Sequence, residues 1–461
     1  MGEGQPGPVR VRPWIRRTAR ILLPILLLIA AWQIWDNVEA RRLDPLVSRL
    51  RDVAAQGRRQ AMIDPPDAEN AARYYAAAAM FVEQNPRGGF EAKYRHIVRA
   101  QREALAGGAP APDWMASAMT KALAHNQATL DLIERGAGAE FYGFAWSRRN
   151  VTQWASLSDA AKVEAMRTIE RLTVGDSKAA ARSLVSRIRY LRAYEHEVGL
   201  AAFRMTIDLQ SVADDLPLLL ARPDVADADL DAIERALVPA YEGERSDRLL
   251  AQLVMSPFGY IEQAWLGRSW QYASAGVLLR PALRHALVPM MRVTNDAVDA
   301  VALPWPDRIR VVESLRDDAV LWTPGGMTGI RRVTPMLRSS LSLLADGMMV
   351  ARASRVAVAA DRHRRMRGAL PASLTDVVPA TAVVDVFTGQ PLHYVRERDG
   401  FVVYSVSRNR ADDRGMLLPV RRKGPRVSFE PAPDVGVRVV YRRAPAASIS
   451  PSNSERNSPV R

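Results

Sequence analysis

HRRMRGALPASLTDVVPATAVVDVFTGQPLHYVRERDGFVVYSVSRNRADDRG, residues 363–415, is the stretch whose order of local structural patterns is clearest. The residues before it predict a long helix from about Thr334, because apolar residues recur there at the three- and four-residue steps of one helix face. Gly368 is typical of a helix C-terminus, and Pro371 prevents the helix from continuing. The stretch therefore opens at the end of a long helix.

A short helical turn and a β-hairpin are expected next. Ser373 and Asp376 have the spacing of a capping box, which predicts one helical turn. Two β-prone segments, Pro391–Glu397 and Phe401–Ser407, flank an Asp-Gly pair, and that pair favours a tight hairpin. Apolar residues occupy both faces of the second segment, so we expect the long helix to cover one face.

Four motifs in this stretch together resemble a known module. They are Gly368-x-Leu370-Pro371-x-Ser373-Leu374, Asp385-x-Phe387-Thr388-Gly389-Gln390-Pro391-Leu392-x-Tyr394, Gly400-Phe401-x-x-Tyr404-Ser405-Val406 and Asn409-x-x-Asp412-Asp413. The module is the C-terminal half of type II secretion major pseudopilins, and the resemblance is greater still to its form in uncharacterised bacterial membrane-anchored proteins. It implies a helix packed on a small antiparallel sheet and a link to secretion or pilus-like machinery.

The sequence departs from the pseudopilin pattern at several positions. Val386 replaces the usual proline, and Ser407 and Arg414 replace two usual glycines. A pseudopilin also has a peptidase site of Gly before Phe, with Glu shortly after, at the start of its membrane helix. Nothing in the segment Arg17–Trp35 supplies such a site. The chain is thus expected to carry a pseudopilin-like end without being a pseudopilin.

The loop after the hairpin is the one candidate metal site. In pseudopilins this loop can hold calcium, and here Asn409, Asp412 and Asp413 form a compact cluster of oxygen ligands. Calcium takes six to eight oxygens, several of them from carboxylates and carbonyls. Arg414 follows the two carboxylates and would compete with a cation, so a solvated turn is the alternative interpretation.

The N-terminus is expected to be a signal anchor in the lipid bilayer. Ile21–Trp35 is an uncharged run of 15 residues, which is short beside the roughly 20 residues of a spanning helix. Tryptophans near both ends suit the membrane interfaces, and five arginines precede the run against Glu3 alone. A cleaved signal peptide is the alternative, although no small-x-small cleavage site follows the run. We therefore predict a single-pass inner-membrane protein with a cytoplasmic N-terminus and a periplasmic or extracellular bulk.

Four parts are expected in all, and the fold class is mainly α. Residues 1–36 form a cytoplasmic tail and anchor, 37–322 a large helical extracytoplasmic domain, 334–443 the pseudopilin-like α+β module, and 444–461 a disordered tail. The glycine-rich segment Thr323–Gly329 suggests the main boundary. The expected helices before it include Lys93–Leu105, Trp114–Arg135, Leu157–Leu172, Lys178–Leu220, Leu230–Leu237, Ser246–Trp265 and Ala282–Ala302.

Composition and motifs restrict the chemistry. The chain has 461 residues, a net charge of +14 and no cysteine, which excludes disulfides, thiolate metal sites and cysteine nucleophiles. Its basic residues alternate with acidic ones and match no nucleic-acid motif, so nucleic-acid binding is not expected. The six histidines lack the spacing of a helical zinc site, and no cofactor or catalytic residue is predicted.

Two classes of function remain. One is a non-enzymatic interaction or scaffold protein of the bacterial envelope, binding an envelope protein or polymer. The other is an envelope enzyme or small-ligand receptor whose site in the helical domain combines residues far apart in the sequence. A deep pocket with converging charged groups would favour the second class, and a shallow, pocket-poor surface would favour the first.

Overall fold

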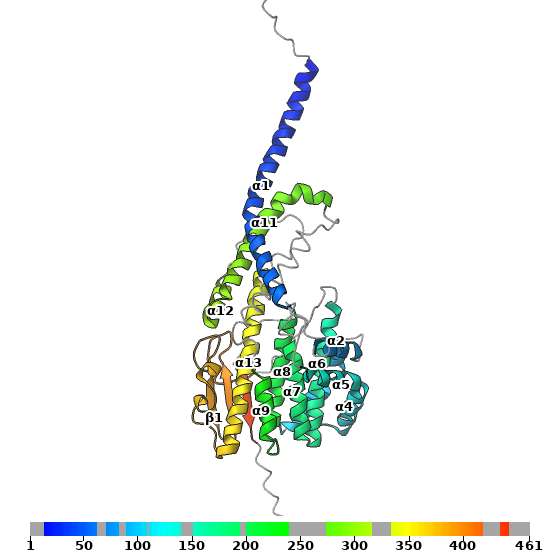
Figure 1. The fold of residues 1–461 in the computed structure, drawn as a ribbon, viewed down its shortest axis with the longest axis vertical. Helices are drawn as coiled ribbons and strands as arrows, with labels where there is room; N and C mark the ends of the chain where they lie inside the picture. The colour runs from blue at the N-terminus through cyan, green and yellow to red at the C-terminus, as the bar shows by residue number, and fades with distance from the viewer. Residues whose placement is uncertain are drawn as a thin grey trace, which may run out of the picture.

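The computed structural model describes residues 13–61, 71–82, 89–107, 110–139, 151–193, 200–238, 273–315, 333–417 and 434–441. The described part is mainly helical, with one three-stranded sheet near the C-terminus (Figure 1). The sequence-predicted fold class is therefore confirmed. The tail 444–461, the boundary segment Thr323–Gly329 and the expected helix Ser246–Trp265 lie outside the described residues.

Helix α1, Pro13–Ala61, is a single long helix that projects away from the rest of the molecule (Figure 1). An 18-residue window within Arg20–Val53 has a mean hydropathy of 1.7, and only 6% of it is buried. Large apolar side chains from Ile21 to Ile29 are exposed around the helix. Towards its C-terminal end the helix packs against α11, Ala273–Ala300, and there Leu43, Val47 and Leu50 enter the core.

The helical body follows α1. Its helices are α2 (Ala71–Phe81), α3 (Gly89–Leu105), α4 (Asp113–His125), α5 (Gln127–Ala137), α6 (Val151–Val174), α7 (Ser177–Ala193), α8 (Leu200–Leu220) and α9 (Asp227–Ala236). The expected helix Trp114–Arg135 is wrong in one respect, because the chain breaks at Asn126. There the amide Nδ2 donates to the carbonyl of Ala122 at 2.8 Å, and such side-chain bonds compete with the helical pattern.

A close approach between α2 and α5 depends on a glycine. A Cβ atom added at Gly136 would lie 2.4 Å from the ring of Tyr75, which is fully buried. The Tyr75 ring packs edge-on against Tyr190 of α7, with centroids 4.7 Å apart. Three helices thus meet around one aromatic pair, and Gly136 is what lets α5 come near enough.

After α11 come α12 (Trp305–Ser314) and the long helix α13 (Val333–Arg367), which ends at Gly368 as predicted. Two short 3-10 turns follow, Leu374–Asp376 and Ala380–Val383. The predicted capping box at the first of them is confirmed. The Ser373 hydroxyl accepts from the Thr375 N–H at 3.3 Å, and the Asp376 carboxylate accepts from the Ser373 N–H at 2.8 Å.

The sheet has the antiparallel order β1-β2-β3, with β1 His393–Glu397, β2 Gly400–Ser405 and β3 Val435–Val440. The predicted hairpin is confirmed, since Glu397 pairs with Gly400 across the turn. All six residues of β2 are buried, because α13 packs against the sheet and the loop at Gly415 contacts Val402 and Tyr404. The helix-on-sheet arrangement expected for this module is therefore present.

One hydrophobic cluster includes buried residues from α1 through to β3. α13 contacts both α8 of the helical body and the strands β2 and β3. In Figure 1, α13 accordingly lies between the sheet and the helical body. The domain boundary at residues 322–334 is predicted from the sequence alone. In the structure, described residues on both sides of it belong to this one hydrophobic cluster.

Candidate functional site

The predicted ligand residues Asn409, Asp412 and Asp413 do lie together in the loop after β2. Asn409 Nδ2 donates to Asp413 Oδ2 at 2.8 Å. Asp412 Oδ1 accepts from the Arg414 N–H at 2.8 Å and from the Tyr404 hydroxyl at 2.9 Å. The N–H of Arg414 holds the pKa of Asp412 below its ordinary value. The loop's carboxylates are therefore already engaged by N–H and O–H donors.

Sequence reasoning missed a third carboxylate at this loop, Asp434, immediately before β3. It is buried, and it accepts from the Gly415 N–H at 2.7 Å and the Asp413 N–H at 3.3 Å. Burial raises the pKa of Asp434, while the two N–H donors act in the opposite direction. No motif could have revealed it, because it stands about 20 residues beyond the loop and reaches it only through the β2–β3 pairing.

Two departures from the pseudopilin pattern fall at special backbone positions. Ser407 and Arg414 have φ values of 56° and 59°, in the left-handed region where glycine is favoured. Ser407 is held there by its hydroxyl, which donates to Asp346 of α13 at 3.2 Å. Arg408 reaches the same carboxylate at 2.5 Å, and burial raises the pKa of Asp346. The loop is thus tied to α13 by a buried acid.

Among the described residues, no group of three or more histidine, aspartate or glutamate side chains is placed to hold a metal ion. Calcium at the loop would have to draw oxygens away from their present donors and recruit the amide oxygen of Asn409, which accepts from the Ala411 N–H at 3.1 Å. Calcium binding at Asn409, Asp412 and Asp413 stays a prediction.

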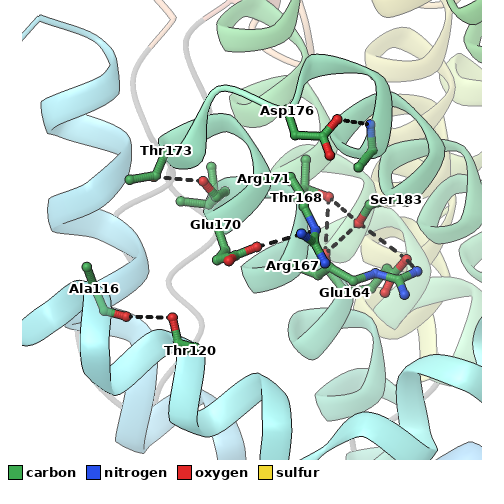
Figure 2. Close-up of polar contacts among 12 residues, drawn as sticks. Ala116, Thr120, Glu164, Arg167, Thr168, Glu170, Arg171, Thr173, Asp176 and Ser183 are labelled. Atoms are coloured by element: carbon green, nitrogen blue, oxygen red, sulfur yellow. Dashed lines mark hydrogen bonds and ion pairs between the residues drawn. The ribbon is translucent and has the colours of Figure 1, made fainter.

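A half-open hollow of about 220 Å³ lies on the helical body between α4, α5 and α6. It is lined by Thr120, Leu123, Ala124, Gln127, Leu130, Arg167, Glu170 and Arg171. Figure 2 shows Glu170 and Arg171 facing one another, and their charged groups are 3.4 Å apart. Pockets for small ligands typically enclose about 300–1,000 Å³, so the hollow is small for a substrate site.

Behind the hollow, Glu164 of α6 is fully buried (Figure 2). Its Oε1 accepts from Arg167 at 2.5 Å and from the Ser183 hydroxyl of α7 at 3.3 Å. Its Oε2 has no hydrogen-bond partner among the described residues. Burial raises the pKa of Glu164 to about 7, against the opposing effects of Arg167 and Ser183. The hydrogen bond from Ser183 to this buried carboxyl group joins α7 to α6.

A second buried charge cluster connects α3, α7 and α8. Asp215 accepts two hydrogen bonds from Arg102, at 2.6 and 3.0 Å, and one from Arg187 at 2.5 Å. Arg187 and Asp215 are both inaccessible to solvent. Two arginines on one carboxylate leave a net positive charge, which the nearby Asp214 partly offsets at 3.9 Å from Arg102. The arrangement is that of a structural cross-link among three helices.

An extended series of polar contacts joins α1 to α11, just beyond the apolar part of α1. Asp36 is 4% exposed and contacts Arg280 at 2.6 Å and Arg284 at 3.0 Å. Glu39, 3% exposed, contacts His285 at 3.0 Å. Further along, Asn295 donates to the carbonyl of Leu46 at 3.3 Å, and Arg49 pairs with Asp299.

These α1–α11 contacts keep a nearly constant separation in sequence, from 244 to 250 residues, in ascending order. The two helices are therefore parallel, and they are joined over about five turns. Arg280 also lies over the ring of Trp32, 5.1 Å from its centroid. Sequence reasoning found the apolar N-terminal segment but missed this partner, because nothing local in either helix indicates the other.

Comparisons with protein-family models, with curated proteins and with solved structures find no match to this chain.

Proposed function

We propose that this chain is a membrane-anchored protein of the bacterial envelope, whose extracytoplasmic bulk is a non-enzymatic interaction or scaffold module. The observation that carries the proposal is the form of α1. From Ile21 to Ile29 it presents exposed apolar side chains, and its second half continues without a break into a polar contact with α11. Such a helix suits a bilayer at one end and a folded domain at the other.

The contacts of α1 favour an anchor that is retained. Cleavage of a signal peptide would fall near the end of the apolar run, in the segment that contains Trp32 and Asp36. Both residues contact α11 there, and the backbone is helical. Proteolytic cleavage needs accessible, extended backbone, which this helix does not offer. The five arginines before the run favour a cytoplasmic N-terminus and a periplasmic bulk.

The described polar groups favour an interaction role over catalysis. The buried carboxylates Glu164, Asp215 and Asp361 bind arginines from their own or neighbouring helices, and Asp346 binds Arg408 of the loop after β2. The hollow on the helical body is half-open and small. Apolar side chains, among them Phe81, Trp114 and Met366, stand exposed on the body and offer contact points for a partner.

The pseudopilin-like end supports a link to secretion or pilus-like machinery. The left-handed positions at Ser407 and Arg414 coincide with the places where the pseudopilin pattern has glycine. The loop therefore keeps, with serine and arginine, backbone conformations that glycine would allow in the pseudopilin loop. This supports a loop of the same shape built from different residues.

A complementation experiment separates the two classes of function. In a strain lacking this gene, secretion and envelope integrity are measured after return of the full chain, of Glu170→Gln with Arg171→Ala, or of residues 37–461 exported without the anchor. A scaffold role predicts that the hollow variant restores the phenotype and the unanchored chain does not. Failure of the hollow variant at normal abundance would instead favour an enzyme or small-ligand receptor.

A further inference from the structure

The anchor is short by itself. The apolar run Ile21–Trp35 extends about 22 Å at 1.5 Å per residue, whereas the hydrocarbon core of a bilayer is about 30 Å thick. Asp36 would end the run if it were free. It is buried against Arg280 and Arg284, so its charge is neutralised by α11. With Asp36 paired, the exposed Val38 extends the lipid-facing surface of α1 beyond Trp35.

α11 meets α1 at the C-terminal end of the apolar run. Its first contacts with α1 are those of Arg280 with Trp32 and Asp36. At the sequence separation of 248, a straight continuation would place residues 273–279 beside residues 25–31, within the apolar part of α1. Figure 1 shows that the first turns of α11 instead bend away from α1 and run across its axis. Pro281, inside the helix, accounts for a bend there.

The bent segment has the composition of a membrane-surface element. The sequence ASAGVLL, residues 273–279, contains no charged residue, and Arg280 follows it immediately. An apolar helix end next to an arginine and a tryptophan matches the chemistry of the interface, where acyl chains meet phosphate and glycerol groups. The orientation across α1 is also that of a helix lying in the plane of a bilayer.

We propose that residues 273–279 of α11 lie in the headgroup layer of the leaflet on the domain side, so that the chain contacts the lipid twice. α1 crosses the bilayer, and α11 rests on it. The Asp36–Arg280–Arg284 contact sets the height of the domain above the membrane and prevents it from tilting freely about α1. This inference rests on the proposed anchoring by α1.

Single nitroxide labels on the full-length chain in phosphatidylglycerol-containing nanodiscs test the proposal. The chain has no cysteine, so Leu278→Cys and Ser274→Cys each create one labelling site. Leu26→Cys, on the exposed apolar part of α1, is the lipid reference, and Ser314→Cys on α12 is the aqueous reference. Collision rates with oxygen and with a water-soluble nickel chelate are compared for the four labels.

We expect the oxygen-to-nickel ratio at Leu278→Cys or Ser274→Cys to be several-fold above that at Ser314→Cys and to approach that at Leu26→Cys. A ratio equal to the aqueous reference would overturn the inference while leaving the anchor intact. Protection of both sites from both reagents would also overturn it, because it would indicate a protein contact. An aqueous ratio at Leu26→Cys would refute the anchor itself, and with it the proposed function.

Discussion

Arg365 of α13 donates to Asp361 of the same helix at 2.7 Å and, with its other nitrogens, to four carbonyls at the end of α8. Asp361 is fully buried, and it also accepts from the Tyr441 hydroxyl, just after β3, at 2.9 Å. One ion pair thus binds the helical body, the long helix and the last strand together. Leu220 is the last residue of α8, where carbonyls lack intrahelical partners, and Arg365 donates to its carbonyl and to those of Arg222, Pro223 and Val225 in the turn that follows.

Replacing Arg365 by alanine should destabilise the protein by about 2–4 kcal/mol, because it leaves partly buried carbonyls and one oxygen of a buried carboxylate without this donor. Arg367→Ala is the matched control, since Arg367 lies exposed at the end of the same helix and should change stability by less than about 0.5 kcal/mol. Urea unfolding followed by circular dichroism measures both. Equal effects would contradict a cross-linking role for Arg365.

Glu164 should make stability fall with rising pH. Its pKa is about 7 in the folded protein and 4.5 ordinarily, so the folded state binds the extra proton between these values. The stability that this proton provides is complete below pH 4.5 and is lost as pH rises through about 7.

Glu164→Gln should therefore remove about 3 kcal/mol of pH dependence across that window. The control Glu134→Gln removes an exposed partner of the same Arg167 and should leave the dependence in place. The measurement is the unfolding free energy as a function of pH. If Glu164→Gln has the same stability–pH profile as the wild type, the pKa of Glu164 in the folded protein is not raised, and the prediction is wrong.

A methyl group at Gly136 should separate α5 from α2. The added Cβ of Gly136→Ala would lie 2.4 Å from the Tyr75 ring, so one helix has to shift, at a cost of about 1–3 kcal/mol. Gly138→Ala is the control, because its nearest neighbour is a carbonyl at 3.5 Å. A thermal melt that drops for Gly138→Ala but not for Gly136→Ala would count against the described packing.

If the loop binds calcium, millimolar calcium should raise the Tm of the full chain in detergent, and Asp412→Asn with Asp413→Asn should abolish the rise. A carboxylate-to-amide change removes the charge that calcium requires while keeping the shape of the side chain. Magnesium serves as the ion control. A Tm that does not respond, together with no heat in calorimetry, would remove the calcium prediction.

Local chemistry explains what could be predicted from the sequence. The stop at Gly368, the capping box at Ser373 and the hairpin before Gly400 each depend on residues within four positions of one another, and all three are confirmed. The composition of the apolar run after Arg20 likewise predicted an apolar helix, and the structure shows that this helix is exposed.

Long-range pairing explains what could not be predicted. Asp434 enters the loop through strand pairing, and Arg365 reaches α8 across more than 140 residues. The partners of Asp36 and Glu39 lie about 250 residues away on α11. Their sequence context shows only charged residues on amphipathic helices, which usually face solvent. Burial of these acids becomes visible only when the helices are brought together.

The central claim is that α1 remains attached and crosses the membrane with the bulk outside. Intact spheroplasts carrying Ser314→Cys are treated with a membrane-impermeant maleimide, after which the carbonate-washed membrane pellet is analysed by mass spectrometry of the whole chain. We expect full labelling on a chain that still begins before residue 13 and stays in the pellet. An unlabelled chain, or a labelled chain that is shortened past Trp35 and released into the wash, would contradict the account.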